Sequence, residues 1–583
     1  MKNDLPREID TEVPNLPSEP TEIWGSDGVA EILRALDIPY IALNPGASFR
    51  GLHDSLVNYL GNTRPQMLLC LHEESAVAIA HGFAKASGRM MAVAVHSNVG
   101  LLHASMAMYN AWCDREPMLI FGATGPVDAD KRRPWIDWIH TCSDQGALTR
   151  DFTKWDNQPA SVPAAYEAVL RGAQIATTAP CGPVYINLDV TLQETKLAAL
   201  PPLPDVARFR APLRAAASPE SIAQAALLLE GAKRVVIFTG RCARTQDGWD
   251  RRVALAEKLQ AYVVTDMRAG ATFPTTHALH VSAGGKLSDE ELKALRSADV
   301  VLGLDCIDLG GSLRQVFGKG SVPAKVINAS CDVYSHRAFS TEYQMLPPVD
   351  VQMLCDADAA VEALLKVLKT QKPAAPKQTV SPATRPDRPA DQICIFDIAE
   401  AFNEAAQGLD VCLTKLPIGW NARYRDLNGP LAFLGSDGGG GLGAGPGTMT
   451  GAALALKGTG TIVAGVHGDG DFLMGVTAVW TAVRYALPCL SIISNNRGYY
   501  NDEAHQESVA RTRSRPVENK GIGQRLTEPD IDLAMMSRSQ GAVGIGPVTK
   551  REGLLPAIRE GLKAVQEGKV CVIDVRVAPG YEA

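Results

Sequence analysis

Short apolar segments alternate with amphipathic helical stretches along this chain from about residue 24 to its end. This alternation is typical of parallel β-sheets with helices on both faces, because each crossover between parallel strands needs a long connection. At 583 residues the chain also exceeds what a single hydrophobic core usually supports. The sequence therefore predicts an α/β fold with three parallel-sheet domains.

Two proline-rich stretches separate the apolar segments into three sets. We predict an N-terminal arm over residues 1–23, a first domain over 24–195, a Rossmann-like middle domain over 215–370, an extended linker over 371–391 and a third domain over 392–583. Strands are expected at 40–44, 67–71, 91–96, 118–122 and 184–189, then at 235–240, 300–305 and 325–330, and finally at 431–435, 461–466, 489–494 and 570–575.

Composition excludes several classes of partner. The net charge is −7 and no long basic run is present, which argues against nucleic acid or an anionic membrane as the main partner. No apolar run reaches the about 18 to 20 residues that cross a bilayer, and the acidic start lacks the features of a secretory signal. Twelve cysteines are scattered singly without a CxxC pair, so we expect free thiols in a reducing cytoplasm.

The most informative stretch is TIVAGVHGDGDFLMGVTAVWTAVRYALPCLSIISNN, residues 461–496. It predicts a strand, a tight turn, a helix of about four turns and a second strand. Parallel strands joined by such a crossover bring their carboxyl ends to one rim, so Asp469 and Asn496 should converge there. Together with the backbone carbonyl of Gly498 they would form a hard oxygen ligand set, which suits Mg²⁺.

Gly468 and Gly470 flank Asp469 and would let backbone amides approach a phosphate group at the start of the helix. A GDG turn alone is a common chain reversal. GDG after one strand, followed by NN after the next, resembles the signature of the thiamine diphosphate enzyme superfamily, in which this unit holds magnesium and the cofactor diphosphate. The chain departs from that pattern at Asp471, where the family usually has a small residue.

A second match, LCLHEESAVAIAHGFAKASG at residues 69–88, resembles the segment that carries the family's catalytic glutamate. The resemblance assigns that role to Glu73, which would contact the cofactor's aminopyrimidine ring across a subunit boundary. Alternatively, Glu73 is only a favourable acid at a helix N-terminus. The glycine-rich segment 438–455 resembles the family segment with the hydrophobic residue that bends the cofactor, here Leu442, which could equally be a packed core leucine.

Three short motifs resemble benzoylformate decarboxylase: NPGAS at 44–48, AVHSNVG at 94–100 and YNAW at 109–112. They imply a proton-transfer role for His96, a reasonable one for imidazole near neutral pH; the alternative is a hydrogen-bonded surface histidine. The family's substrate-contacting serine is replaced by Ala47, with Ser48 adjacent. We find no counterpart of that family's second active-site histidine in the middle domain.

The polar stretch after NN contains Asp502, Glu503 and His505. By resemblance to pyruvate decarboxylase, in which a glutamate at the spacing of Asp502 faces the reacting carbon, we predict that one of the three reaches the substrate, with Asp502 and His505 as the candidate catalytic residues. A solvated loop is the alternative. NPGAS also resembles the acetolactate synthase loop PGGAS, so that enzyme is a second interpretation. It usually binds FAD in its middle domain, and FAD stays an open alternative here that we do not predict. A non-catalytic relative is a third, although one would be expected to have lost Glu73, Asp469 or Asn496.

The resemblance therefore implies a thiamine diphosphate- and magnesium-dependent enzyme. Its expected reaction is the non-oxidative decarboxylation of a 2-oxo acid, with carboligation to an aldehyde as a further activity. By the same resemblance we expect at least a homodimer, and a homotetramer as the complete assembly.

Overall fold

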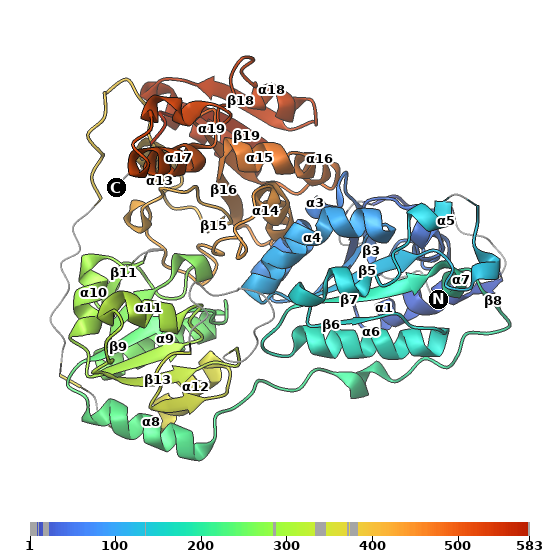
Figure 1. Ribbon diagram of the computed structural model, residues 1–583, viewed down its shortest axis with the longest axis horizontal. Coiled ribbons are helices and arrows are strands. Elements are labelled where there is room, and N and C mark those ends of the chain that lie inside the picture. The colour runs from blue at the N-terminus through green and yellow to red at the C-terminus, as the bar shows by residue number, and fades with distance from the viewer. Residues whose placement is uncertain are drawn as a thin grey trace.

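The computed structural model describes residues 9, 11–15, 22–134, 136–283, 287–332, 346–369, 372–373 and 383–580. Three parallel sheets with helices on both faces organise this part of the chain, which confirms the predicted α/β fold. In Figure 1 they form three lobes, coloured blue to cyan, green to yellow, and orange to red. No helix in these ranges has the length and apolar character needed to cross a bilayer.

The first sheet has six parallel strands in the order β3-β2-β4-β5-β7-β6. In that order their bounds are Gln66–Leu69, Tyr40–Leu43, Ala92–Ala94, Met118–Thr124, Pro183–Asp189 and Trp155–Asn157. All five predicted strands are present, and β6 is an additional edge strand. Ile41 and Leu43 pack on one face and Tyr40 and Ala42 on the other, as the two-residue period of a strand requires.

Helices cover both faces of the first sheet. Helices α1 (Gly25–Ala35) and α6 (Val162–Thr177) pack on one face, and α3 (Glu73–Ser87) and α4 (Ser97–Asp114) pack on the other. The short antiparallel pair of β1 (Ile23–Trp24) and β8 (Lys196–Leu197) joins the two ends of this region. Most of the predicted arm over 1–23 lies outside the described residues.

The middle sheet is also parallel, in the order β11-β10-β9-β12-β13-β14. Its strands are His280–Ala283, Tyr262–Thr265, Val235–Thr239, Val300–Leu304, Lys325–Ala329 and Val351–Met353. Its helices are α8 (Pro219–Gly231), α9 (Gln246–Leu259) and α12 (Ala357–Val367) on one face, with α10 (Asp289–Arg296) and α11 (Leu309–Phe317) on the other. The three predicted strands correspond to β9, β12 and β13.

The third sheet has the order β15-β16-β17-β19-β18, all parallel. Its strands are Val411–Leu413, Ile462–Gly468, Leu490–Asn495, Cys571–Arg576 and Val543–Val548. Helices α13 (Ile395–Ala405) and α19 (Leu554–Gln566) cover one face, and α14 (Ala444–Ala455), α16 (Thr477–Arg484) and α18 (Leu533–Arg538) cover the other.

The predicted strand over 431–435 is wrong. Only Phe433 forms an isolated bridge, with Leu413. The segment bonds to two parts of the chain. Ala432 and Leu434 make backbone hydrogen bonds to Leu413 of β15, and the Phe433 carbonyl accepts from the N–H of Ala271 in the middle domain at 2.9 Å. Gly435 then turns the chain with a φ of 88°, which ends any extended run.

The predicted single helix after GDG is also wrong in detail. It is divided into α15 (Asp469–Gly475) and α16, with Val476 between them. A Cβ atom at Gly475 would lie 2.0 Å from the carbonyl oxygen of Gly443, so the glycine-rich turn before α14 passes directly against the break. Close approach of two backbones accounts for the interruption.

Helices α3 and α14 join the first and third lobes (Figure 1). A Cβ atom at Gly82 would lie 2.0 Å from the Thr448 carbonyl oxygen, and one at Gly451 would lie 2.0 Å from that of Ile79. The two helix backbones are therefore in direct contact, and residues of both contribute to one hydrophobic core. This packing holds the start of α3 at a fixed position relative to the third sheet.

Part of the predicted linker over 371–391 lies outside the described residues. Its described end packs on the third lobe rather than extending freely. Arg385 pairs with Asp397 of α13 at 2.9 Å, and Arg388 donates to the carbonyl of Pro579 at 3.2 Å.

Candidate active site

The carboxyl ends of β16 and β17 form the first part of the site. These strands pair with Gly468 opposite Ser494, which brings Asp469 to the same rim as the residues that follow β17. One carboxylate oxygen of Asp469 accepts from the N–H of Gly470 at 2.9 Å, and the other accepts from the N–H of Gly498 at 3.1 Å. We call the group Gly468, Asp469, Gly470, Asn496 and Gly498 the cradle.

The two asparagines of the NN motif have different environments. Asn495 donates to Asp574 at 2.8 Å and accepts from the N–H of Arg497 at 3.1 Å, so it stabilises the turn. The Asn496 side-chain oxygen, in contrast, is buried without a hydrogen-bond partner. A buried acceptor of this kind costs free energy unless a ligand meets it.

Asp469 also lacks a compensating cation. Burial raises the pKa of this carboxyl group, and hydrogen bonds from the Gly470 and Gly498 amides only partly oppose the effect. Within the described ranges Asp469 forms no ion pair. A carboxylate without a cation partner and an amide oxygen without a hydrogen-bond partner fit a hard divalent cation such as Mg²⁺.

Asp471, which departs from the family pattern, does not add an uncompensated charge to the cradle. Its carboxylate accepts from the N–H of Gly443 at 2.9 Å and lies 3.8 Å from the Lys415 ammonium and 3.4 Å from the His467 ring. Although burial opposes ionisation, Lys415 and His467 hold the pKa of Asp471 below its usual range. Lys415 pairs with Asp437 as well, so one buried ammonium serves two carboxylates.

The glycine-rich turn before α14 is held at both ends. The N–H of Gly439 donates to Asn110 at 3.1 Å, and the N–H of Gly443 donates to Asp471. Between these contacts the Leu442 side chain is 40% exposed. Leu442 is therefore not a packed core leucine within this chain.

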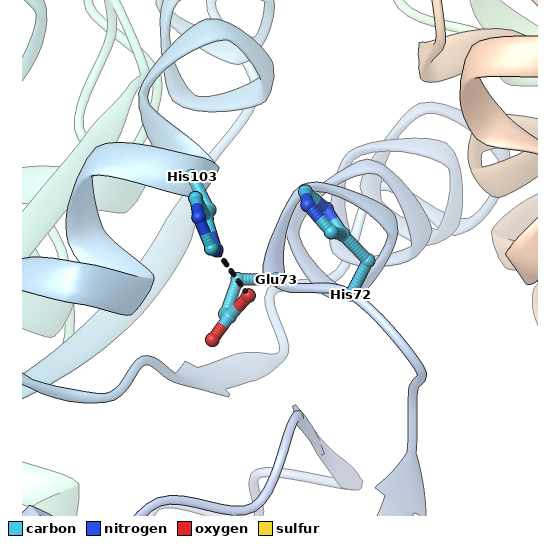
Figure 2. Close-up of side chains that lie close together, drawn as sticks. All are labelled: His72, Glu73 and His103. Carbon is cyan, nitrogen blue, oxygen red and sulfur yellow. Dashed lines mark hydrogen bonds and ion pairs between the residues drawn. The ribbon is translucent and has the colours of Figure 1, made fainter.

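Glu73 is the first residue of α3, and His72 caps the helix by accepting from the N–H of Glu74 at 3.2 Å. The Glu73 carboxylate is buried and lies 3.1 Å from Nδ1 of His103. Figure 2 shows that His103 projects from α4 toward the His72 ring, with the Glu73 carboxylate beside the gap between them; the two rings stack with their centroids 5.0 Å apart. Sequence analysis did not identify His103.

Glu73 packs against the first turns of α4. A Cβ atom at Gly100 would lie 2.9 Å from one Glu73 carboxylate oxygen, so a larger residue would displace the acid. Leu71 and Leu102, near the two ends of this contact, are 44% and 57% exposed. Within the described residues of one chain, no hydrogen bond or ion pair joins Glu73 to the cradle.

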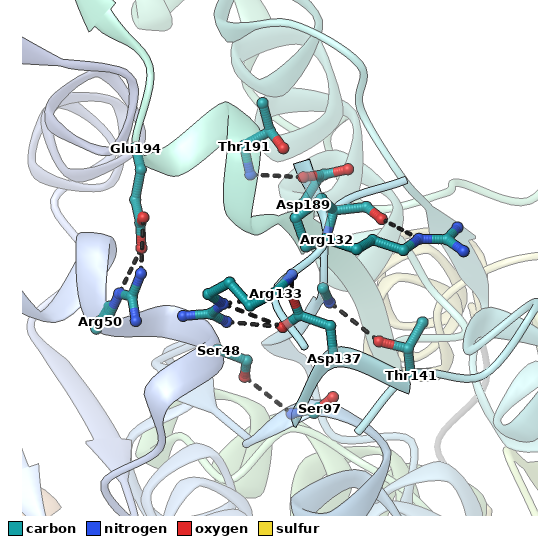
Figure 3. Close-up of polar contacts among 12 residues, drawn as sticks. Ser48, Arg50, Ser97, Arg132, Arg133, Asp137, Thr141, Asp189, Thr191 and Glu194 are labelled. Atoms are coloured by element: carbon teal, nitrogen blue, oxygen red, sulfur yellow. Dashed lines mark hydrogen bonds and ion pairs between the residues drawn. The ribbon is translucent and has the colours of Figure 1, made fainter. Parts of the chain in front are cut away.

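His96 precedes α4 and faces the NPGAS loop. Its Nδ1 lies 2.9 Å from Oγ of Ser48 and 3.4 Å from the Ser48 backbone nitrogen. Ser48 in turn accepts from the N–H of Ser97 at 3.1 Å, as Figure 3 shows. Burial lowers the pKa of His96 and repulsion by His140 lowers it further, whereas Glu73 opposes both effects. Ala47 is exposed, so Ser48 is the hydroxyl that this loop directs inward.

The structure does not bring Asp502 and His505 to the cradle. Both lie on the exposed side of α17 (Tyr500–Thr512). Glu503 is the buried acid of this helix, 5% exposed and 3.4 Å from Arg525. A Cβ atom at Gly498 would lie 3.6 Å from the Glu503 carboxylate, which places this acid, rather than its neighbours, beside the cradle.

Family comparisons agree with this geometry. The models of the thiamine pyrophosphate enzymes match in chain order: the N-terminal TPP binding domain at residues 23–148, the central domain at 222–364 and the C-terminal TPP binding domain at 417–575. The chain therefore belongs to the thiamine pyrophosphate enzymes.

Similar proteins narrow the class further. The chain is 26% identical to the acetolactate synthase large subunit of Lactococcus lactis subsp. lactis, covering 92% of this chain and 95% of that protein. It is 25% identical to benzoylformate decarboxylase of Pseudomonas aeruginosa, covering 92% and 96%. The crystal structure of benzoylformate decarboxylase from Polynucleobacter necessarius has the same fold, with a TM-score of 0.79 at 21% identity over 96% of this chain and 99% of that one. This is a thiamine pyrophosphate-dependent enzyme of the acetolactate synthase and decarboxylase family.

Proposed function

We propose that this enzyme removes carbon dioxide from a 2-oxo acid and releases an aldehyde, in the manner of benzoylformate decarboxylase. The observation that carries the proposal is the contact between Ser48 and His96. It fixes the His96 imidazole within electrostatic reach of the buried acid Glu73, where it would deliver a proton to the product. Carboligation of a second aldehyde is the accompanying activity we expect.

The cradle would hold magnesium and the cofactor diphosphate. Asp469, Asn496 and the carbonyl of Gly498 would be the metal ligands, and the Gly468–Gly470 turn at the start of α15 would receive the phosphate groups. Leu442 would support the bent cofactor from its exposed position. When bound, thiamine diphosphate supplies an electron sink beside the substrate carbonyl.

The protein's own side chains would then control protons. Glu73, held by His103, would hydrogen-bond to the aminopyrimidine ring. Ser48 occupies Nδ1 of His96, so Nε2 is the nitrogen left to exchange a proton with the substrate. Asp502 and His505 remain predicted substrate contacts that would need a neighbouring subunit to reach the site.

We also propose that the active unit is at least a homodimer, and a homotetramer in full. Glu73 does not contact the cradle of its own chain, while apolar side chains around it, Leu71 and Leu102, are exposed. In a dimer, Glu73 of one subunit would face the cradle of the other. A cytoplasmic location is supported by the cysteines, all twelve of which are free.

Product analysis tests the reaction. The purified protein would be incubated with thiamine diphosphate, Mg²⁺ and a panel of 2-oxo acids, and carbon dioxide and products would be measured. Benzaldehyde from benzoylformate supports the proposal. Acetolactate from pyruvate would replace it with the synthase reaction of the Lactococcus lactis relative.

A further inference from the structure

The buried acid Glu73 has a single side-chain partner. Nδ1 of His103, on α4, lies 3.1 Å from Oε2 of Glu73, and no other side chain of the described residues forms a hydrogen bond or ion pair with this carboxylate. An ionised carboxylate can only accept, so the hydrogen of this bond lies on Nδ1. The bond is therefore charge-assisted, which makes it stronger than a bond between neutral groups.

The His103 ring is itself held in place by His72. The ring centroids are 5.0 Å apart and the planes meet at 21°, so the two rings stack (Figure 2). His72 is fixed in turn, because its Nδ1 accepts from the N–H of Glu74 at 3.2 Å. Burial lowers the pKa of His72 although Glu73 opposes this, which favours the neutral ring that the bond from Glu74 requires.

Both oxygens of the Glu73 carboxylate have fixed surroundings. Oε2 is bonded to His103, and a Cβ atom at Gly100 would lie 2.9 Å from Oε1. One bonded oxygen and one packed oxygen fix the plane of the carboxylate. A fixed orientation is what a group needs if it is to hydrogen-bond a cofactor ring without first rearranging.

Other polar groups near Glu73 do not replace the bond from His103. Glu74 faces the third domain, since its Oε1 would lie 3.5 Å from a Cβ atom at Gly443. His96 acts on Glu73 only through space, because its Nδ1 is bonded to Ser48. Removal of the His103 ring would therefore leave Glu73 without a side-chain donor in the described part of the chain.

We infer that His103 is a positioning residue that acts on the reaction through Glu73. The inference rests on the proposed function, in which Glu73 hydrogen-bonds to the aminopyrimidine ring of the cofactor. The bond from Nδ1 holds the carboxylate in the orientation that meets this ring. Removal of the C2 proton of the cofactor, which that contact promotes, is faster for this reason than it is with a free carboxylate.

The test measures cofactor activation without any substrate. The holoenzyme, loaded with thiamine diphosphate and Mg²⁺, is mixed with D₂O and quenched with acid, and proton NMR gives the exchange rate at C2. His103→Leu removes the donor, whereas His103→Asn places an amide N–H where Nδ1 stands. We expect exchange to slow about tenfold in His103→Leu, the loss of one hydrogen bond to a charged group, and to stay within about threefold of wild type in His103→Asn. Affinity for thiamine diphosphate should change less than about threefold in both.

Two further variants serve as controls. The His103 side chain is 51% exposed, so its replacement removes little buried surface. His103→Ala, which favours the helix, should slow exchange as His103→Leu does. His277→Leu removes a similar pair in the middle domain, where Nε2 lies 3.3 Å from Glu257, and should exchange at the wild-type rate.

The outcomes separate this inference from the proposed function. Wild-type exchange in His103→Leu would overturn the inference, and so would equal slowing in His103→Asn and His103→Leu, because the ring rather than its N–H would then matter. Slow exchange in His103→Leu with recovery in His103→Asn supports the inference, even if no 2-oxo acid is decarboxylated; that result would overturn only the proposed reaction.

Discussion

The carboxyl-end rims of the middle and third sheets differ in how their charged groups are compensated. At the middle rim, Oδ2 of Asp332 contacts Arg241 at 3.3 Å and Arg115 of the first domain at 2.8 Å. At the third rim, Asp469 has only backbone N–H donors, and the buried oxygen of Asn496 has no partner. Each rim has one buried oxygen without a hydrogen-bond partner, Oδ1 of Asp332 and Oδ1 of Asn496. The difference is that Asp332 has two arginine partners, whereas Asp469 has no cation partner among the described residues.

This difference shows why a Rossmann-like pattern alone does not predict a nucleotide site. Both sheets follow the rule that parallel strands present ligand-binding loops at their carboxyl ends. In the middle domain, Arg244 after β9 also reaches the first domain, pairing with Glu116 at 2.9 Å. The cations at this rim are therefore used for domain docking.

The largest expected effect is a loss of turnover without a matching loss of cofactor binding at the third rim. In Glu73→Gln we expect turnover to fall about 100- to 10,000-fold, because the amide cannot act as a carboxylate toward the aminopyrimidine ring. Affinity for thiamine diphosphate, measured by calorimetry, should change less than about threefold. Glu31→Gln, a buried glutamate on the opposite face of the first sheet, should behave as wild type. Normal turnover in Glu73→Gln would exclude the assigned role.

The next effect compares the two rims directly. Asp469→Ala should weaken Mg²⁺-dependent binding of thiamine diphosphate by at least about 100-fold, since it removes a metal ligand and not merely a supporting contact. The matched change at the middle rim, Asp332→Asn, should leave cofactor affinity within about twofold. Calorimetric titrations with and without Mg²⁺ measure both. Equal losses in the two variants would show that the rims do not differ as described.

A smaller effect concerns the charge cluster behind the cradle. Lys415→Met leaves Asp437 and Asp471 buried without their shared cation, so we expect the free energy of unfolding to fall by about 3 kcal/mol. Adding Asp471→Asn should recover part of that loss, because one of the two carboxylates is then neutral. Urea unfolding of the single and double variants measures the coupling. Strictly additive effects would mean that Lys415 and Asp471 do not interact.

The sequence predicted the sheets more reliably than the contacts of the site. Long apolar strands such as β5 and β19 have a strong pattern because both of their faces are buried. The false strand at 431–435 has the same apolar pattern, yet its backbone makes only an isolated bridge to Leu413 and also bonds to the middle domain at Ala271. Apolar composition does not show which backbone a segment will pair with.

Residues distant in sequence were the hardest to predict. Asp469 and Asn496 belong to one strand–helix–strand unit, so their spacing in the sequence was enough to predict that they lie at the same rim. His103 on α4 contacts Glu73, and His140 after α5 (Ile136–Ile139) contacts His96, and no local sequence motif predicts either contact. Only the contact of His103 could have been predicted from the sequence, because His103 lies two helical turns after His96 and therefore on nearly the same face of α4.

The smallest expected effect is a pH dependence of stability that arises at the middle rim. Burial raises the pKa of Asp305, which follows β12, to about 6, although Arg241 opposes the rise. In the unfolded chain this carboxyl group loses its proton near pH 4, so between about pH 4 and 6 the unfolded state is favoured as pH increases. In Asp305→Asn this pH-dependent loss of stability disappears, and asparagine tolerates the positive φ of 49° at this position.

Urea unfolding from pH 4 to 7.5 should therefore show the variant gaining roughly 2 kcal/mol of unfolding free energy relative to wild type across that interval. If the difference in unfolding free energy between variant and wild type is constant with pH, Asp305 ionises in the folded protein as readily as in the unfolded chain. The neighbouring arginine would then offset the cost of burying this carboxylate in full.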